Sequence, residues 1–87
     1  KAIFFNPQYA EAYDNRGSAE FVLNNYKDAL KDYSKSVELN SKNAAVYKNR
    51  GMLKLTMGDK LGACSDLLKS SELGEPSADV ALKKYCH

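Results

Sequence analysis

The sequence predicts an all-α fold in which antiparallel helix pairs stack into an α-solenoid. Three observations predict it: an internal repeat of 34 residues, apolar residues at helical spacing, and short connections between the helical segments. When residues 10–40 are aligned with residues 44–74, 11 of the 31 pairs are identical. A fixed period of this size is typical of stacked repeats, in which each unit buries one face against its neighbour.

Each repeat contains two amphipathic segments joined by a tight turn. The apolar spacing predicts four helices, over residues 8–23, 26–39, 43–57 and 60–73. Asn24 and Asn25 suit a turn because asparagine tolerates left-handed backbone conformations, and Gly58 ends one helix where Asp59 caps the next. Because every connection is only a few residues long, neighbouring helices are expected to run antiparallel.

The two ends of the chain are expected to differ from the complete units. Lys1 lies 34 residues before Lys35, so residues 1–9 are predicted to be the end of a preceding repeat. Their apolar part is too short for a signal peptide. Residues 76–87 place apolar side chains on one helical face and predict a single capping helix. The chain is thus expected to form one domain, divided into residues 1–9, 10–43, 44–75 and 76–87.

Composition and motifs favour a binding protein over an enzyme. The net charge of +2 is small and the charges are interspersed, which excludes the basic patch of a nucleic-acid binder. No apolar run reaches transmembrane length. The chain has one histidine, at its last position, and neither a phosphate-binding glycine loop nor a nucleophile with a partnered base. We expect no cofactor and no metal site, since adjacent Cys86 and His87 are not at a usual ligand spacing.

Small and aromatic residues within each unit resemble the pattern of the tetratricopeptide repeat (TPR) family. The matching positions are Tyr13, Gly17, Ala29 and Tyr33 in the first unit, and Tyr47, Gly51 and Ala63 in the second, where Leu67 replaces the second aromatic. The resemblance implies that the two helices of a unit cross closely at the glycine and alanine. The end of the chain also looks like the terminal unit of a bacterial subgroup of this family, which implies a C-terminal fragment.

The resemblance further implies a protein–protein interaction module whose concave groove, lined by the first helix of each unit, binds a peptide or helix of a partner protein. It nominates as groove residues Glu11, Asp14, Asn15, Ser18, Phe21, Val22, Lys48, Asn49, Met52, Leu55 and Thr56. Asn15 and Asn49 recur, and an amide offers a partner's backbone both a donor and an acceptor. The alternative is that each asparagine bonds the neighbouring helix or water.

Chaperone-binding members of the family resemble one another in a carboxylate clamp of lysine, asparagine and arginine. With Asn49 in the clamp, the first unit would need cationic and amide groups where Asp14 and Ser18 stand. With Asn15 in the clamp, the second unit would need cations where Ala45 and Asn49 stand. We therefore expect no such clamp.

Two recurring arginines are predicted to have structural roles, and the alternative is that they bind an anion. Arg16 and Arg50 are expected to stack on Tyr13 and Tyr47, and Arg16 is expected to pair with Glu20 one turn later.

Cys64 stands where the first unit has Leu30, a position expected to face the next helix. For the second unit that helix is the capping one, which carries Cys86. A disulfide between Cys64 and Cys86 would fix the capping helix to the last repeat. The alternative is a pair of buried, reduced thiols that pack as small apolar side chains.

A second function stays open beside the interaction module: a structural end-cap or self-association segment of a longer TPR array. If the first complete unit begins the stack, its apolar side is uncovered, and a homodimer through this N-terminal repeat edge is then expected.

Overall fold

The computed structural model describes the backbone of residues 7–86 and the side chains of residues 9–86. Within this range the chain forms five helices and no strand: α1 (Pro7–Val22), α2 (Tyr26–Leu39), α3 (Ala44–Thr56), α4 (Lys60–Glu72) and α5 (Pro76–Tyr85). The all-α prediction is confirmed, and each predicted repeat helix agrees with the observed one to within one residue at either end. The segment predicted to end a preceding repeat lies mostly outside the described residues, as does His87.

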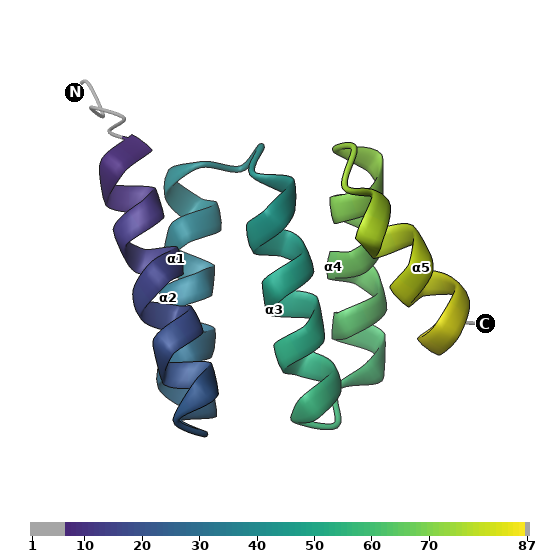
Figure 1. Ribbon diagram of the computed structural model, residues 1–87, viewed down its shortest axis with the longest axis horizontal. Helices are drawn as coiled ribbons and strands as arrows, with labels where there is room; N and C mark the ends of the chain where they lie inside the picture. The colour runs from purple at the N-terminus through teal and green to yellow at the C-terminus, as the bar shows by residue number, and fades with distance from the viewer. Residues whose placement is uncertain (1–6, 87) are drawn as a thin grey trace.

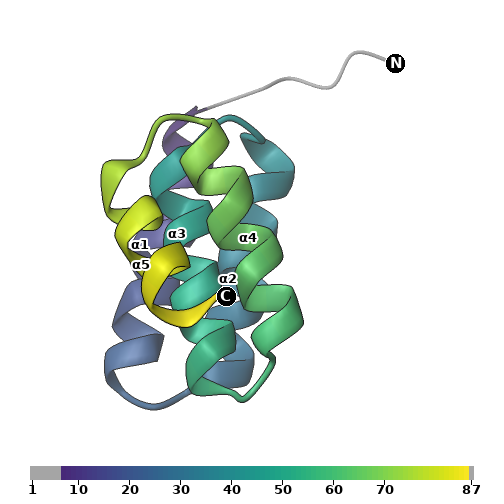
Figure 2. The same cartoon turned by 90° about the vertical axis from the view of Figure 1, so that its right-hand side faces the viewer.

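The helices lie side by side in chain order and alternate in direction (Figure 1). α1, α3 and α5 form one layer, and α2 and α4 form the other, as the end-on view in Figure 2 shows. Each helix packs against the next one in the chain. The arrangement is therefore a short stack of antiparallel helix pairs that α5 closes at the C-terminal end.

The turns follow from the residues that occupy them. Asn24 adopts φ 65° and Gly58 adopts φ 90°, the left-handed conformations that a tight turn after a helix requires. The side chain of Asp59 accepts a hydrogen bond from the backbone N–H of Gly62 at 2.9 Å, as expected of a helix cap. The chain reverses direction over three residues in each of these turns, 23–25 and 57–59.

The core forms where the two helices of each unit cross. A Cβ atom on Gly17 would lie 3.0 Å from the buried ring of Tyr33. On Gly51 it would lie 3.0 Å from the Cγ atom of buried Leu67 and 3.1 Å from the carbonyl oxygen of Ala63. The close crossing that the resemblance implied is therefore present in both units.

Recurring polar residues join the helices of each unit in the same way. The buried hydroxyl of Ser36 donates to the carbonyl oxygen of Ala10 at 2.7 Å. The hydroxyl of Ser70, its counterpart in the second unit, donates to the carbonyl oxygen of Ala44 at the same distance. Each bond ties the second helix of a unit to the start of its first helix.

The predicted pairing of Arg16 with Glu20 is wrong. The Arg16 guanidinium donates two hydrogen bonds, of 2.7 and 2.8 Å, to the carboxylate of Asp32 in α2. Asp32 offers both oxygens to the planar guanidinium from across the helix pair, a better match than a carboxylate one turn along the same helix. The predicted stacking is observed, because the guanidinium of Arg16 lies 5.5 Å from the ring centroid of Tyr13. The guanidinium of Arg50 lies 5.7 Å from that of Tyr47.

Candidate partner-binding face

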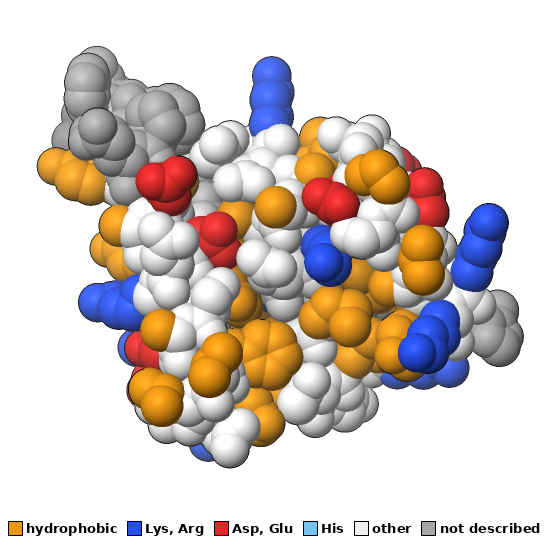
Figure 3. All heavy atoms as spheres, in the orientation of Figure 1, with side chains coloured by type: hydrophobic (Ala, Val, Ile, Leu, Met, Phe, Trp, Pro, Cys, Tyr) orange, Lys and Arg blue, Asp and Glu red, His pale blue; other side chains and the backbone are white. Residues whose placement is uncertain are grey.

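The nominated groove residues lie on α1 and α3, which belong to the same layer. We call the outward surface of α1, α3 and α5 the binding face; Figure 3 looks onto it. The nominated residues that are exposed are Glu11, Asn15, Val22 and Thr56. Those that are half-buried are Asp14, Ser18, Phe21, Lys48, Asn49, Met52 and Leu55.

A hydrogen bond joins the two units across this face. The side-chain amide of Asn49 in α3 donates to Asp14 Oδ1 in α1 at 3.2 Å. Burial raises the pKa of Asp14, the bond from Asn49 partly offsets this rise, and the nearby Glu11 adds to it. Asn49 therefore bonds the neighbouring helix, which was the alternative to a partner-binding role, while its amide oxygen stays available as an acceptor.

Asn15 is placed differently from Asn49, although the two residues are equivalent in the repeat. Its side chain is exposed, and among the described residues its amide makes no hydrogen bond to the protein. Val22, two turns further along α1, is 83% exposed. An unengaged amide and an exposed apolar side chain thus lie on the same side of α1.

Two hydroxyl groups of the face are engaged in internal bonds. The hydroxyl of Ser18 lies 2.9 Å from the phenol oxygen of Tyr33, and that of Thr56 donates to the carbonyl oxygen of Met52 at 3.1 Å. Burial raises the pKa of the Tyr33 phenol, and the bond to Ser18 lowers it in part. These groups mainly stabilise the scaffold.

α5 contributes to the face in a way that the sequence did not predict. Met52 and Leu55, nominated as groove residues, pack against a cluster formed by Leu67, Ala78 and Ala81. Leu82, Tyr85 and Cys86 cover the same cluster. The signal was present in the sequence, because the capping helix occupies the place that the first helix of a third unit would take.

Charged and apolar side chains occupy different parts of the binding face. In Figure 3 most apolar side chains gather in the lower half, toward the α1–α2 and α3–α4 turns, and acidic side chains lie above them. Glu11 and Asp14 are carried by α1, and Lys48 by α3. The face thus offers an apolar surface beside a charged one.

Cys64 in α4 and Cys86 after α5 are joined by a disulfide, with their Cα atoms 5.8 Å apart. The bond ties the C-terminal end of α5 to α4. In residues 7–86 no His, Cys, Asp and Glu side chains are grouped to hold a metal ion. Over the same range no helix combines the length and the apolar character needed to span a membrane.

Comparisons with known proteins agree with this architecture. Residues 10–43 match the family model of the tetratricopeptide repeat. The fold is similar to a solved structure described as the first TPR of Spaghetti (RPAP3) bound to the HSP90 peptide SRMEEVD. Its TM-score is 0.79 and its sequence identity is 22%, over 95% of this chain and 73% of that chain. Among curated proteins there is no match to this sequence. Residues 10–43 thus match the tetratricopeptide repeat, and the fold of the chain is that of a TPR-like stack of helices.

Proposed function

We propose that this chain is a protein–protein interaction module whose binding face holds a peptide or helix of a partner protein. One observation carries the proposal: most residues that recur between the units are used inside the scaffold, whereas the face, apart from Asn15 and Asn49, differs from unit to unit. Recurring arginine, aspartate, serine and glycine residues make the ion pairs, hydrogen bonds and helix crossings described above. On the face, Glu11 and Asp14 of the first unit are replaced by Ala45 and Lys48 in the second.

Exposed side chains supply the contacts for such a partner. Asn15 offers a donor and an acceptor, which suit the peptide groups of an extended chain. Val22 and the apolar lower half of the face can bury apolar side chains of the partner, which drives association. The mixture of a few polar groups with an apolar surface is typical of a peptide-binding site.

Charge indicates which peptides the face accepts. The peptide in the similar TPR structure, SRMEEVD, is acidic. Here Glu11 and Asp14 lie close enough that Glu11 raises the pKa of Asp14, so this part of the face is already crowded with negative charge. An acidic peptide would add like charge, and we propose that the partner segment is neutral or basic.

Selection from a random peptide library against the 87-residue chain tests the proposal. Selected peptides are expected to be neutral or basic, and their affinity is expected to fall about tenfold in Asn15→Ala, which corresponds to roughly 1.4 kcal/mol. Val22→Ser is expected to weaken the same peptides. The matched control is Lys31→Ala, an exposed residue of α2 in the other layer.

Circular dichroism is used to check that each variant keeps its helices. Peptides that bind Asn15→Ala and Val22→Ser as tightly as the parent chain would count against the binding face. A selection dominated by acidic peptides would leave the face in place but contradict the proposed charge preference.

A further inference from the structure

The turns that precede α2 and α4 expose apolar side chains at one edge of the stack. Residues 23–25 and 57–59 form these turns, and both lie at the same end of the helices, as Figures 1 and 2 show. Val22 and Leu23 stand at the first turn and are 83% and 68% exposed. Met57 and Leu61 stand at the second turn and are 39% and 88% exposed. We call these four residues the turn patch.

The connections at the two ends of the helices differ in character. Leu23 recurs as Met57, so both units place an apolar residue at the same position of the turn. At the opposite end residues 40–43 are all polar, and in residues 73–75 the one apolar side chain, Leu73, is half-buried. Exposed apolar surface that is gathered in one place is typical of a contact with a protein or a membrane.

The side chains of the turn patch protrude from the edge. Val22 and Leu61 keep most of their surface in water, whereas the walls of a groove would cover part of it. A folded protein partner would need a separate cavity for each of these side chains. The boundary between the headgroups and the acyl chains of a bilayer has no fixed shape, and it takes up apolar side chains to a depth of about 5–10 Å. The shape of the edge therefore favours a lipid bilayer.

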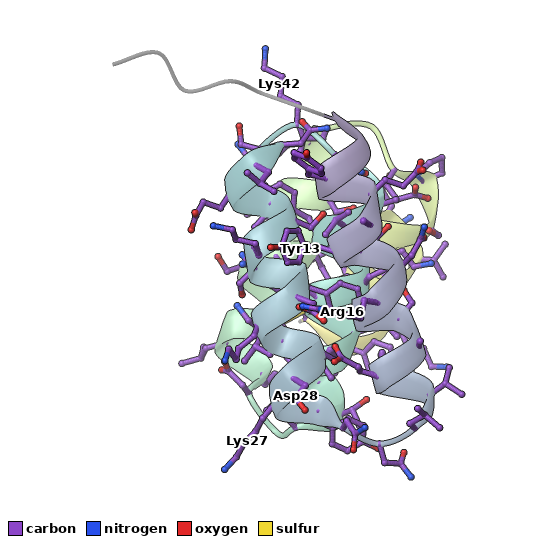
Figure 4. The ribbon with its side chains drawn as sticks, turned by 90° about the vertical axis from the view of Figure 1, so that its left-hand side faces the viewer. Tyr13, Arg16, Lys27, Asp28 and Lys42 are labelled. Carbon is purple, nitrogen blue, oxygen red and sulfur yellow. A yellow bond between two sulfur atoms is a disulfide. The ribbon has the colours of Figure 1, made fainter. Side chains whose placement is uncertain are left out.

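Exposed charges are divided unevenly between the two ends of the stack, leaving aside Arg16, whose charge Asp32 balances. α5 starts from the 73–75 connection, so its last turn points toward the end that carries the turn patch. The exposed charged residues of that half are Lys27, Lys31, Lys60, Lys83 and Lys84, against Asp28 and Asp59. Those of the other half are Lys35, Lys42 and Lys69, against Glu11, Glu38, Glu72 and Asp79. Figure 4 shows Lys27 and Lys42 extending from opposite ends. Positive charge thus predominates on the side of the turn patch.

We infer that the turn patch inserts into the interface of an anionic lipid bilayer, while the lysines of this half lie toward the negative headgroups. Insertion removes apolar surface from water, and each lysine held near the membrane adds attraction. The helices then stand on the membrane, and the binding face along their sides stays in water. Val22 belongs to both surfaces, whereas Leu23 and Leu61 are not among the nominated groove residues. The inference is therefore independent of the proposed function.

Cosedimentation of the 87-residue chain with lipid vesicles tests the inference. The chain is expected to bind equimolar vesicles of phosphatidylcholine and phosphatidylserine about tenfold more tightly than vesicles of phosphatidylcholine alone, since the lysines gain only from anionic headgroups. Leu23→Ser and Leu61→Ser are each expected to weaken binding to the anionic vesicles about fivefold, because less apolar surface is buried. Lys27→Ala is expected to weaken it by a similar factor.

Two matched controls stand at exposed positions outside the turn patch. Val80→Ser removes an apolar side chain of α5 that is 66% exposed, close to the value for Leu23. Lys42→Ala removes an exposed lysine from the opposite end of the stack. Both variants are expected to bind the anionic vesicles as tightly as the parent chain. Circular dichroism checks that every variant keeps its helices.

Three outcomes would each overturn the inference. The first is a lack of binding to either kind of vesicle, or equal binding to both. The second is a loss in Val80→Ser as large as in Leu61→Ser, which would mean that the turn patch has no special part in binding. The third is sedimentation of the chain without lipid as a dimer that Leu61→Ser dissociates, since a second copy would then occupy the turn patch.

Discussion

The guanidinium of Arg50 donates two hydrogen bonds to the carboxylate of Asp66, from Nε at 2.7 Å and from Nη2 at 2.9 Å. The bonds join α3 to α4, and Asp66 is only 5% exposed. Hydrogen bonding to Asp66 raises the pKa of Arg50 further above its ordinary value. Arg16 and Asp32 repeat the geometry one unit earlier, which makes this ion pair a structural element of the repeat.

Arg50→Ala is expected to lower the free energy of unfolding by about 3 kcal/mol, because it leaves the buried carboxylate of Asp66 with only Lys54, whose Nζ lies 3.1 Å away. Arg16→Ala is expected to cost less, because its side chain is exposed to water. Urea unfolding measures both, with Lys31→Ala as the exposed control. Equal losses at the two arginines would contradict the difference in burial.

Glu20→Gln is expected to stabilise the fold at pH 7 and to have little effect at pH 3. Hydrogen bonding between the carboxyl groups of Glu20 and Asp32 raises the pKa of Glu20. A raised pKa means that the folded chain favours the protonated acid. Its contribution is complete below the unfolded pKa of about 4.3 and is lost as the pH rises through the folded pKa. Glutamine mimics the protonated acid at every pH.

Asp32 behaves in the opposite sense, because the Arg16 guanidinium lowers its pKa. Its contribution is present above the unfolded pKa of about 3.9 and is lost on acidification. Thermal unfolding between pH 3 and pH 7 separates the two carboxyl groups. A stability gain from Glu20→Gln that is the same at both ends of this range would contradict the raised pKa of Glu20.

Ser70→Ala is expected to lower the free energy of unfolding by about 1 kcal/mol, because it removes the 2.7 Å bond to the carbonyl oxygen of Ala44 from a site that water does not reach. Ser36→Ala removes the equivalent bond to Ala10 and is expected to cost about the same. Denaturant unfolding of the two variants and of the exposed Ser65→Ala gives the comparison. If Ser70→Ala left the free energy of unfolding unchanged, the hydrogen bond to the carbonyl oxygen of Ala44 would contribute nothing to stability.

Reduction of the Cys64–Cys86 disulfide is expected to destabilise the fold by about 3 kcal/mol, since the bond closes a loop with a sequence separation of 22. The loss is expected to concentrate in α5, which packs mainly on α4. Hydrogen exchange with and without a dithiol reductant measures it, and Cys86→Ser serves as the control that reductant leaves unchanged. Two freely alkylated thiols in protein purified without reductant would contradict the bond.

The first four helices could be predicted because the apolar pattern of each helix in the unit occurs twice in the sequence. The turns between them use residues that favour few backbone conformations. The partner of Arg16 was missed because a carboxylate one turn away, Glu20, looked as suitable as one in the next helix. The repeat held the answer: Arg16 and Asp32 recur together as Arg50 and Asp66, whereas Glu20 is replaced by a lysine.

The two asparagines of the binding face show a second limit of predicting side-chain contacts from the sequence. Asn15 and Asn49 occupy equivalent positions, yet among the residues that the structure describes only Asn49 has a carboxylate of a preceding unit beside it. Equivalence within a repeat predicts backbone placement. It does not predict side-chain partners at the ends of the stack, where the neighbouring unit changes.

The hydrogen bond between Asp14 and Asn49 also links α1 to α3 on the binding face. For a partner bound across both helices, as proposed, the spacing between its successive contact points would depend on this link as well as on the packing of the core. A substitution at either residue would change which partner lengths fit, even if every exposed contact residue stayed the same. Asp14 and Asn49 would in this way affect the choice of partner through the width of the binding face alone.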